Sequence, residues 1–226
     1  MAPWQAVGQR GAEGAGRERF GTGRGRRQPG RCRLQDRPEP SDAPAAVHTT
    51  EHAGKSSQEK RAEIAEWLGE KKLDAVVIAA LDSLAWLFNI RGADVERTPV
   101  ALGFALVHAD GTADLFMAES KLPGEVRAHL GNAVRVHPRE AFVPALGDLS
   151  GKRVGVDPER SVHAIFAALE AANAKIVELR DPCVLAKAVK NPVEQAGHRA
   201  AQARDGAALS RFLKWLGETA RSEERV

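Results

Sequence analysis

The sequence is poor in cysteine and has no long apolar run. Its 226 residues contain two cysteines, Cys32 and Cys183, which cannot build a disulfide framework or hold a structural zinc ion by themselves. The longest apolar run, 75–81, has seven residues, whereas a membrane-spanning helix needs about 20. The scarcity of cysteine favours a reducing compartment, so we expect a cytoplasmic protein. With 43% hydrophobic and 28% charged residues, it should have a packed core and no membrane contact.

Short motifs of the common enzyme classes are also missing. The sequence has no phosphate loop, no dinucleotide fingerprint, no nucleophile elbow and no HExxH pair. The best group of mixed metal ligands is His108 with Asp110 and Asp114, and its place at a turn favours ordinary turn polarity. We interpret Cys183 as a buried structural thiol and His163 as a histidine at the edge of the core. The residues alone therefore predict no catalytic residue and no metal site.

Lysine is absent from the first 35 residues, which hold eight Arg, eight Gly and only two acidic residues. This leader has a net charge of +6, and because the whole chain is +3 the remainder carries −3. It shows no strand or helix period, so we predict that residues 1–35 form a disordered leader. Nucleic-acid binding by its charge is a second hypothesis, less favoured, and organelle targeting a third. Translation of GC-rich DNA in an unintended frame would also give this composition.

Residues 36–56 have the composition of an extended linker. Pro38, Pro40 and Pro44 alternate there with Ser, Asp and Ala, and such stretches usually connect folded domains.

From residue 57 to residue 182 the pattern becomes that of one α/β domain. Apolar side chains at helical spacing, such as Ile64, Trp67 and Leu68, alternate with short Val- and Ile-rich runs. Asp110-Gly111 predicts a hairpin with a type I′ turn. We expect a mixed sheet flanked by helices. The predicted strands are 73–78, 101–108, 113–118, 133–136, 153–156 and 175–179, and the predicted helices are 57–69, 84–90, 140–149 and 162–172.

A long helix is predicted from Asn191 onwards. Asn191 is a suitable N-cap, Pro192 suits the first helical position, and Glu194 is the acid of a capping box. The apolar stripe of this helix continues through Phe212 and Trp215, and it needs a partner to be buried. We expect these two side chains to be partly exposed unless the helix folds back or dimerises.

The densest polar group among apolar residues is Asp82, Asn89, Arg91 and Asp94. A buried Arg–Asp pair that orients the Arg91-Gly92 turn is the structural interpretation, and contact with a substrate is the alternative.

Two segments resemble the Xaa-Pro aminopeptidases (aminopeptidase P), which belong to the creatinase/prolidase-like metallopeptidases. The first is 80–95, which contains Leu-Asp, Ala-Trp-Leu, Asn, Arg-Gly and Asp in the family's order, and the second is 181–216. The resemblance covers about 36–226. The residues that match the family motifs, for which we expect structural roles, are Asp82, Trp86, Asn89, Arg91, Gly92, Asp94, Lys187, Lys190, Asn191 and Glu194.

The resemblance implies a three-domain enzyme that removes the N-terminal residue preceding proline from peptides. Residues 57–182 would be its creatinase-like middle domain, and 183–226 would begin its pita-bread catalytic domain. The family binds two divalent metals, manganese or zinc, through two Asp, one His and two Glu, none of which can be carried onto this chain. We therefore expect a fragment that is inactive alone and has no cofactor. A non-catalytic interaction module that forms a homodimer is the alternative, and nucleic-acid binding by the leader is the second alternative.

Overall fold

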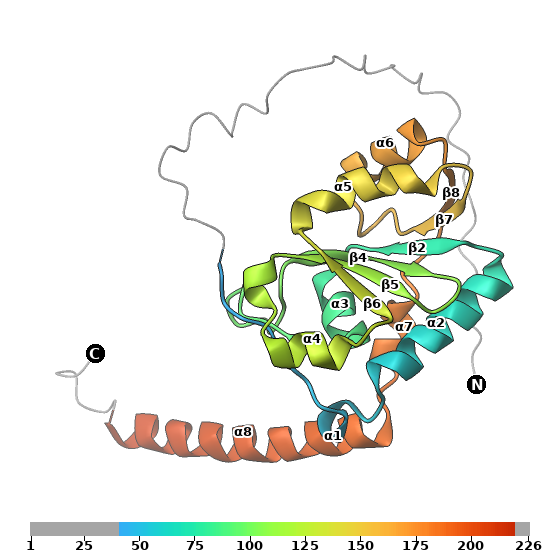
Figure 1. The fold of residues 1–226 in the computed structure, drawn as a ribbon. Helices are drawn as coiled ribbons and strands as arrows, with labels where there is room; N and C mark the ends of the chain where they lie inside the picture. The colour runs from blue at the N-terminus through green and yellow to red at the C-terminus, as the bar shows by residue number, and fades with distance from the viewer. Residues whose placement is uncertain (1–40, 220–226) are drawn as a thin grey trace, which may run out of the picture. The chain divides into compact units, whose positions relative to one another are not determined.

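The computed structural model describes residues 41–219, and within this range six strands form one mixed sheet (Figure 1). The strand order is β6-β5-β4-β2-β7-β8. β4 is antiparallel to both of its neighbours, whereas the pairs β5–β6, β2–β7 and β7–β8 are parallel. This is the mixed α/β sheet that the sequence predicts. Its strands are β2 (Ala75–Ile78), β4 (Gly103–His108), β5 (Ala113–Met117), β6 (Val134–His137), β7 (Arg153–Val156) and β8 (Lys175–Glu178).

Helices cover both faces of the sheet, so its central strand is apolar on both sides. All four residues of β2 are buried. Val76 and Ile78 belong to one core cluster and Ala75 and Val77 to the other, as expected from the two-residue period of a strand. α2 (Ser57–Lys71), α3 (Leu81–Leu87), α4 (Gly124–Leu130) and α7 (Cys183–Ala188) contribute to the first cluster, and α5 (Phe142–Ala145) and α6 (His163–Ala171) to the second.

The described part of the predicted linker, residues 41–56, contains two short elements that pack on the domain. β1 (Ala46–Val47) pairs with β3 (Ile90–Arg91), and α1 (Thr50–Ala53) follows it. Ala45 and Ala53 are buried. This stretch is therefore attached to the sheet domain through backbone pairing and apolar contact. The predicted leader, 1–35, lies outside the described residues.

The predicted hairpin is confirmed, but its predicted type I′ turn is wrong. A type I′ turn needs a positive φ at both central residues. Gly111 has a φ of 80° and Asp110 is not among the positive-φ residues. The Gly111 N–H donates to the His108 carbonyl oxygen at 3.0 Å, so a four-residue connection joins β4 to β5.

Two predicted helices differ from the structure. The predicted helix 140–149 consists of three short pieces, η3 (Arg139–Ala141), α5 and η4 (Leu146–Leu149). Pro144 lies in the middle of this stretch, and it lacks the N–H that a continuous helix would use. The predicted helix 84–90 is α3, which begins earlier and ends at Leu87, so that Ile90 and Arg91 can pair with β1. A further short 3-10 helix, η2 (Glu119–Lys121), follows β5.

The long C-terminal helix, α8 (Pro192–Thr219), begins where the sequence predicts. The Glu194 N–H donates to Asn191 Oδ1, and the Asn191 N–H donates to Glu194 Oε2, both at 3.0 Å. No residue of α8 is buried, and Phe212 and Trp215 are 50% and 56% exposed. Among the described residues, no helix is long and apolar enough to cross a membrane.

Candidate functional site

Lys60, a residue that the motif comparison did not include, lies at the centre of one group of motif residues. Its side chain extends from α2 and is 2% exposed. Nζ donates to Asn89 Oδ1 at 2.6 Å and to the Trp86 carbonyl oxygen at 2.9 Å, and it lies 4.4 Å from the centroid of the Trp86 ring. Burial lowers the pKa of Lys60 to about 8, although the negative charge of Glu194 opposes the shift. Its spacing from Ile64 and Leu68 on the apolar face of α2 is the signal that could have identified it.

Asn89 connects three segments of the chain. It is fully buried and has a φ of 50°, a left-handed conformation that Asn tolerates better than most residues. Its Nδ2 donates to the Lys55 carbonyl oxygen, and its own carbonyl oxygen accepts from the His48 N–H. The end of α3 is thereby joined to α2 and to the residues that follow β1.

The Arg91-Gly92 turn is held by backbone groups, so the predicted buried Arg–Asp pair is wrong. Arg91 Nη1 donates to the carbonyl oxygens of Ala85 and Ile90, each at 2.9 Å. A Cβ at Gly92 would lie 2.6 Å from the Ala101 Cβ and 2.7 Å from its backbone nitrogen. Glycine is therefore required here by space.

Asp94 pairs with Lys121 instead of Arg91. Its Oδ1 forms an ion pair with Lys121 Nζ, and its Oδ2 accepts from the Leu102 N–H at 2.7 Å. Burial favours protonation of this carboxyl, but the hydrogen bonds from Lys121 and Leu102 hold the pKa of Asp94 below its ordinary value. Its role is to fix the segment between β3 and β4.

Asp82 and Lys187 connect α3 to α7. Lys187 Nζ contacts Asp82 Oδ2 and donates to Ser83 Oγ at 2.8 Å. The Ser83 hydroxyl donates to Asp181 Oδ2 at 2.6 Å, and the Asp181 N–H donates to Asp157 Oδ2 at 2.8 Å. Burial alone would raise the pKa of Asp82, but Lys187 holds it below its ordinary value.

Asn191 and Glu194 attach the start of α8 to the domain. Asn191 Nδ2 donates to the Ala53 carbonyl oxygen at 2.8 Å, in addition to its capping contacts. The charge of Glu194 acts on Lys60 and Arg91. The Lys190 side chain is exposed, and the Lys190 carbonyl oxygen accepts from Gln195 Nε2 at 2.8 Å.

Three basic side chains, two of which are histidines, contact the carboxylate of Asp114. His108 Nε2 lies 2.7 Å from Asp114 Oδ2, and His137 Nε2 lies 2.7 Å from Oδ1. Arg135 donates to both oxygens, at 2.7 and 2.8 Å. Burial alone would raise the pKa of Asp114, but these three contacts hold it well below its usual range. The interpretation as turn polarity fits Asp110, which accepts from Thr112, whereas His108 and Asp114 form a pair.

The donor set of the described residues does not fit the metal pair of the family. Within 41–219, no group of three or more His, Cys, Asp or Glu side chains could hold a metal ion. At Asp114 the bidentate Arg135 already supplies a cation to both carboxylate oxygens.

The predictions for the two remaining candidate residues, Cys183 and His163, have different outcomes. Cys183 is fully buried, and burial raises the pKa of its thiol, so the prediction of a structural thiol is confirmed. His163 is exposed as the first residue of α6, so its prediction as a core-edge histidine is wrong.

Known proteins resemble this chain over most of its length. Residues 36–194 match the family model of the Creatinase/Prolidase N-terminal domain. A probable Xaa-Pro aminopeptidase P of Aspergillus niger is 39% identical over 191 residues, which is 80% of this chain. One of Coccidioides posadasii is 38% identical over 190 residues, again 80% of this chain. The chain spans 31% of the length of each of these two relatives.

A solved structure agrees with these sequence matches. The X-prolyl aminopeptidase of Caenorhabditis elegans, described as a cytosolic enzyme with a di-nuclear active site, superposes with a TM-score of 0.74 at 31% identity. The match covers 81% of this chain and 31% of that one. Sequence, fold and motif residues agree, and the chain belongs to the creatinase/prolidase N-terminal domain family.

Proposed function

We propose that this chain is the non-catalytic α/β part of an Xaa-Pro aminopeptidase, together with the first helix of its catalytic domain. The observation that carries the proposal is that the motif residues make structural contacts between elements. Asp82 of α3 pairs with Lys187 of α7, and Asn191 at the start of α8 donates to the Ala53 carbonyl oxygen of α1. These contacts support a structural role at the junction between the sheet domain and α8.

In this proposal the whole protein is a cytoplasmic metallopeptidase that acts on peptides with proline in the second position. The domain would comprise 57–182 with its attached N-terminal elements, and 183–226 would belong to the catalytic part. The C. elegans relative, described as cytosolic with a di-nuclear active site, supports the location and the metal chemistry. When bound, such a metal pair activates water for attack on the peptide carbonyl, and the residues of this chain would orient the helix that leads to it.

The 226-residue chain alone should not hydrolyse Xaa-Pro peptides. The test is to purify it, add Mn²⁺ or Zn²⁺ and follow release of the first residue from a peptide with proline in the second position. The C. elegans enzyme serves as the positive control. We expect no release above the blank. Release that a chelator abolishes and that added metal restores would overturn the proposal.

A second candidate function, a self-associating module, is favoured by one observation. Leu209, Phe212 and Trp215 of α8 are each at least half exposed, which is unusual for a cluster of large apolar side chains. Size-exclusion chromatography with light scattering over a range of concentrations tests it. A dimer that Phe212→Ser converts to a monomer would support this function, and a monomer at every concentration would exclude it.

A further inference from the structure

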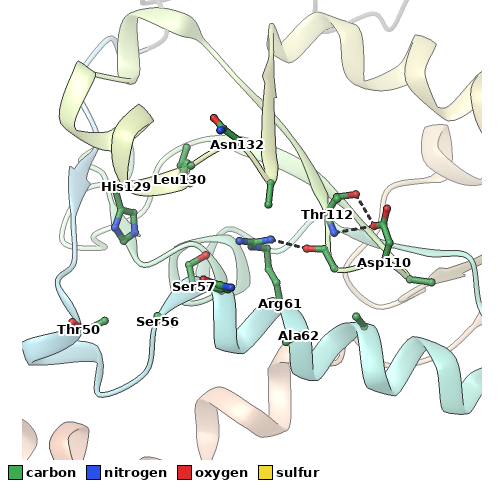
Figure 2. A pocket seen from close by; sticks show the side chains of 16 residues that line it. Thr50, Ser56, Ser57, Arg61, Ala62, Asp110, Thr112, His129, Leu130 and Asn132 are labelled. Atoms are coloured by element: carbon green, nitrogen blue, oxygen red, sulfur yellow. Dashed lines mark hydrogen bonds between the residues drawn. The ribbon is translucent and has the colours of Figure 1, made fainter.

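A cavity of about 680 Å³ lies between α2, the end of α4 and the β4–β5 turn (Figure 2). None of the family-motif residues lines it. Its volume falls in the range of cavities that hold small molecules, about 300–1,000 Å³. It therefore needs an explanation separate from the junction with α8.

Arg61 brings a buried positive charge to this cavity. Its side chain reaches from α2 toward the β4–β5 turn (Figure 2), where Nη1 donates to the Gly111 carbonyl oxygen at 2.6 Å. Arg61 is 6% exposed, and its Nε is buried without a hydrogen-bond partner among the described residues. Burial lowers the pKa of Arg61, and no carboxylate opposes the shift. Buried charges are ordinarily paired, because an unpaired one loses its hydration without compensation.

The guanidinium group of Arg61 is only partly hydrogen-bonded within the described residues. Nη1 donates to the Gly111 carbonyl oxygen, whereas Nε, on the edge that it forms with Nη2, is covered by the protein and has no hydrogen-bond partner among residues 41–219. Two parallel N–H groups on such an edge match the two oxygens of a carboxylate or phosphate. An oxyanion that pairs with this edge must first displace the atoms that cover Nε.

Ser57 supplies a second unpaired polar group, one turn away on the same face of α2. It is 6% exposed, lines the cavity, and its Oγ is buried without a partner among the described residues. It is also the first residue of a 15-residue helix. The positive end of the helix dipole therefore acts on the same part of the cavity.

The other polar groups of the lining do not neutralise Arg61. The one acidic residue in the lining, Asp110, lies on the exposed turn and accepts from the N–H and hydroxyl of Thr112 at 2.9 and 2.7 Å. His129 and Asn132 border the same space from the end of α4 (Figure 2). His129 Nε2 lies 3.0 Å from the Phe88 carbonyl oxygen.

We propose that this cavity binds a small molecule through its oxyanion, a carboxylate or a phosphate, held by the Nε–Nη2 edge of Arg61 and the hydroxyl of Ser57. The volume exceeds that of the oxyanion, so the ligand has a further body, which Ala62, Ala65 and Leu130 face with apolar surface. The proposal is independent of the peptidase assignment. The result of the peptide hydrolysis assay does not affect the anion titration described next, and the titration does not test the peptidase assignment.

The test is an NMR titration of the full 226-residue chain with inorganic phosphate and, separately, with acetate. Chloride replaces each anion to keep the ionic strength constant. The backbone amides of Ser57, Arg61 and Gly111 and the Arg61 Nε–H group report on the cavity. We expect saturable shifts of these signals with at least one anion. Shifts with phosphate alone or acetate alone would each support the proposal and identify the oxyanion.

Three variants separate the cavity from general charge effects. Arg61→Gln should abolish the saturable shifts, and Ser57→Ala should weaken binding roughly tenfold, as expected for loss of a hydrogen bond to a charged group. Arg127→Gln, at an exposed position of α4 outside the lining, should bind as the wild type does. The eight arginines of the leader are present in every variant, so their contribution cancels.

Ser57→Ala keeps the test decisive if Arg61→Gln does not fold. Without ligand, this variant should be at least as stable as the wild type, because it removes a buried hydroxyl that has no partner. Wild-type affinity in Ser57→Ala and in any folded Arg61→Gln, or no saturable shift of the cavity amides with either anion, would overturn the proposal.

Discussion

Lys60 is a buried ammonium group whose near partners are neutral. Its Nζ contacts an amide oxygen, a backbone carbonyl oxygen and the face of Trp86. Such contacts satisfy the N–H groups, but they compensate the loss of hydration less completely than an adjacent carboxylate would. The consequence is a pKa of about 8, far below that of an exposed lysine.

This lowered pKa predicts that the protein becomes more stable as the solution becomes more alkaline. Between about 8 and the unfolded value of about 10.4, the unfolded chain holds a proton on Lys60 that the folded chain has released. The contribution of Lys60 to the free energy of unfolding should rise across this window by up to about 3 kcal/mol. Urea unfolding at a series of pH values measures it.

Lys60→Met is the control, because it removes the titrating group and keeps the aliphatic chain. The pH-dependent difference between wild type and variant isolates Lys60 from the Cys183 thiol. The raised pKa of that thiol acts in the opposite direction in the same range. A parallel pH dependence in the two proteins would contradict the prediction.

Gly92→Ala should destabilise the fold because a Cβ there overlaps Ala101. Overpacking of this kind costs about 1–3 kcal/mol. Gly69→Ala is the matched control, since a Cβ at this exposed position in α2 meets nothing within 4 Å. It should be neutral or stabilise the helix by up to about 1 kcal/mol. Equal effects of the two substitutions on the urea midpoint would contradict the steric argument.

At the scale of the elements, α2 and α1 differ in how their first turns are satisfied. Ser56 forms a complete capping box with Glu59 at the start of α2, whereas the N-cap of α1, Thr49, makes no side-chain capping bond. Ser56→Ala should therefore cost about 1 kcal/mol of stability, and Thr49→Ala should cost much less. Thermal unfolding of both variants measures the difference, and a larger loss in Thr49→Ala would contradict it.

The sequence predicts best those elements whose ends are determined by neighbouring residues. β7 matches its prediction at both ends, and the start of α8 is set by neighbouring residues of the capping box. β1 and β3 were not predicted, because each has only two residues and exists through pairing with the other, more than 40 residues away. Local periodicity holds no information about such a pair.

The motif residues could be named from the sequence, but most of their partners could not. Asp94 has Arg91 close by in sequence, yet it pairs with Lys121, which lies 27 residues away. Lys60 meets Asn89 across 29 residues. Arg61 and Ser57 belong to no motif, and the missing partners of Arg61 Nε and Ser57 Oγ become visible only when the chain is folded.

At the scale of the whole molecule, α8 should exchange its amide hydrogens much faster than the sheet. No residue of α8 is buried, whereas every residue of β2 is. A helix without tertiary packing is marginally stable in water and opens often. Hydrogen exchange followed by mass spectrometry at low protein concentration should show early exchange over 200–219 and late exchange over 75–78.

The concentration dependence of this exchange is informative as well. If the chain self-associates through Phe212 and Trp215, protection of α8 should increase as the concentration rises, and Phe212→Ser should remove the increase. Protection of α8 equal to that of β2 at low concentration would contradict the marginal stability predicted for this helix.

Gly54 leaves the space that the capping side chain of α8 occupies. Gly54 ends α1 with a φ of 67°, and a Cβ there would lie 2.4 Å from Asn191 Oδ1, the atom that caps α8. One added methyl group should displace the Asn191 side chain, which donates to the Ala53 carbonyl oxygen. The cap at the start of α8 therefore depends on the missing side chain of a residue that belongs to neither the sheet nor that helix.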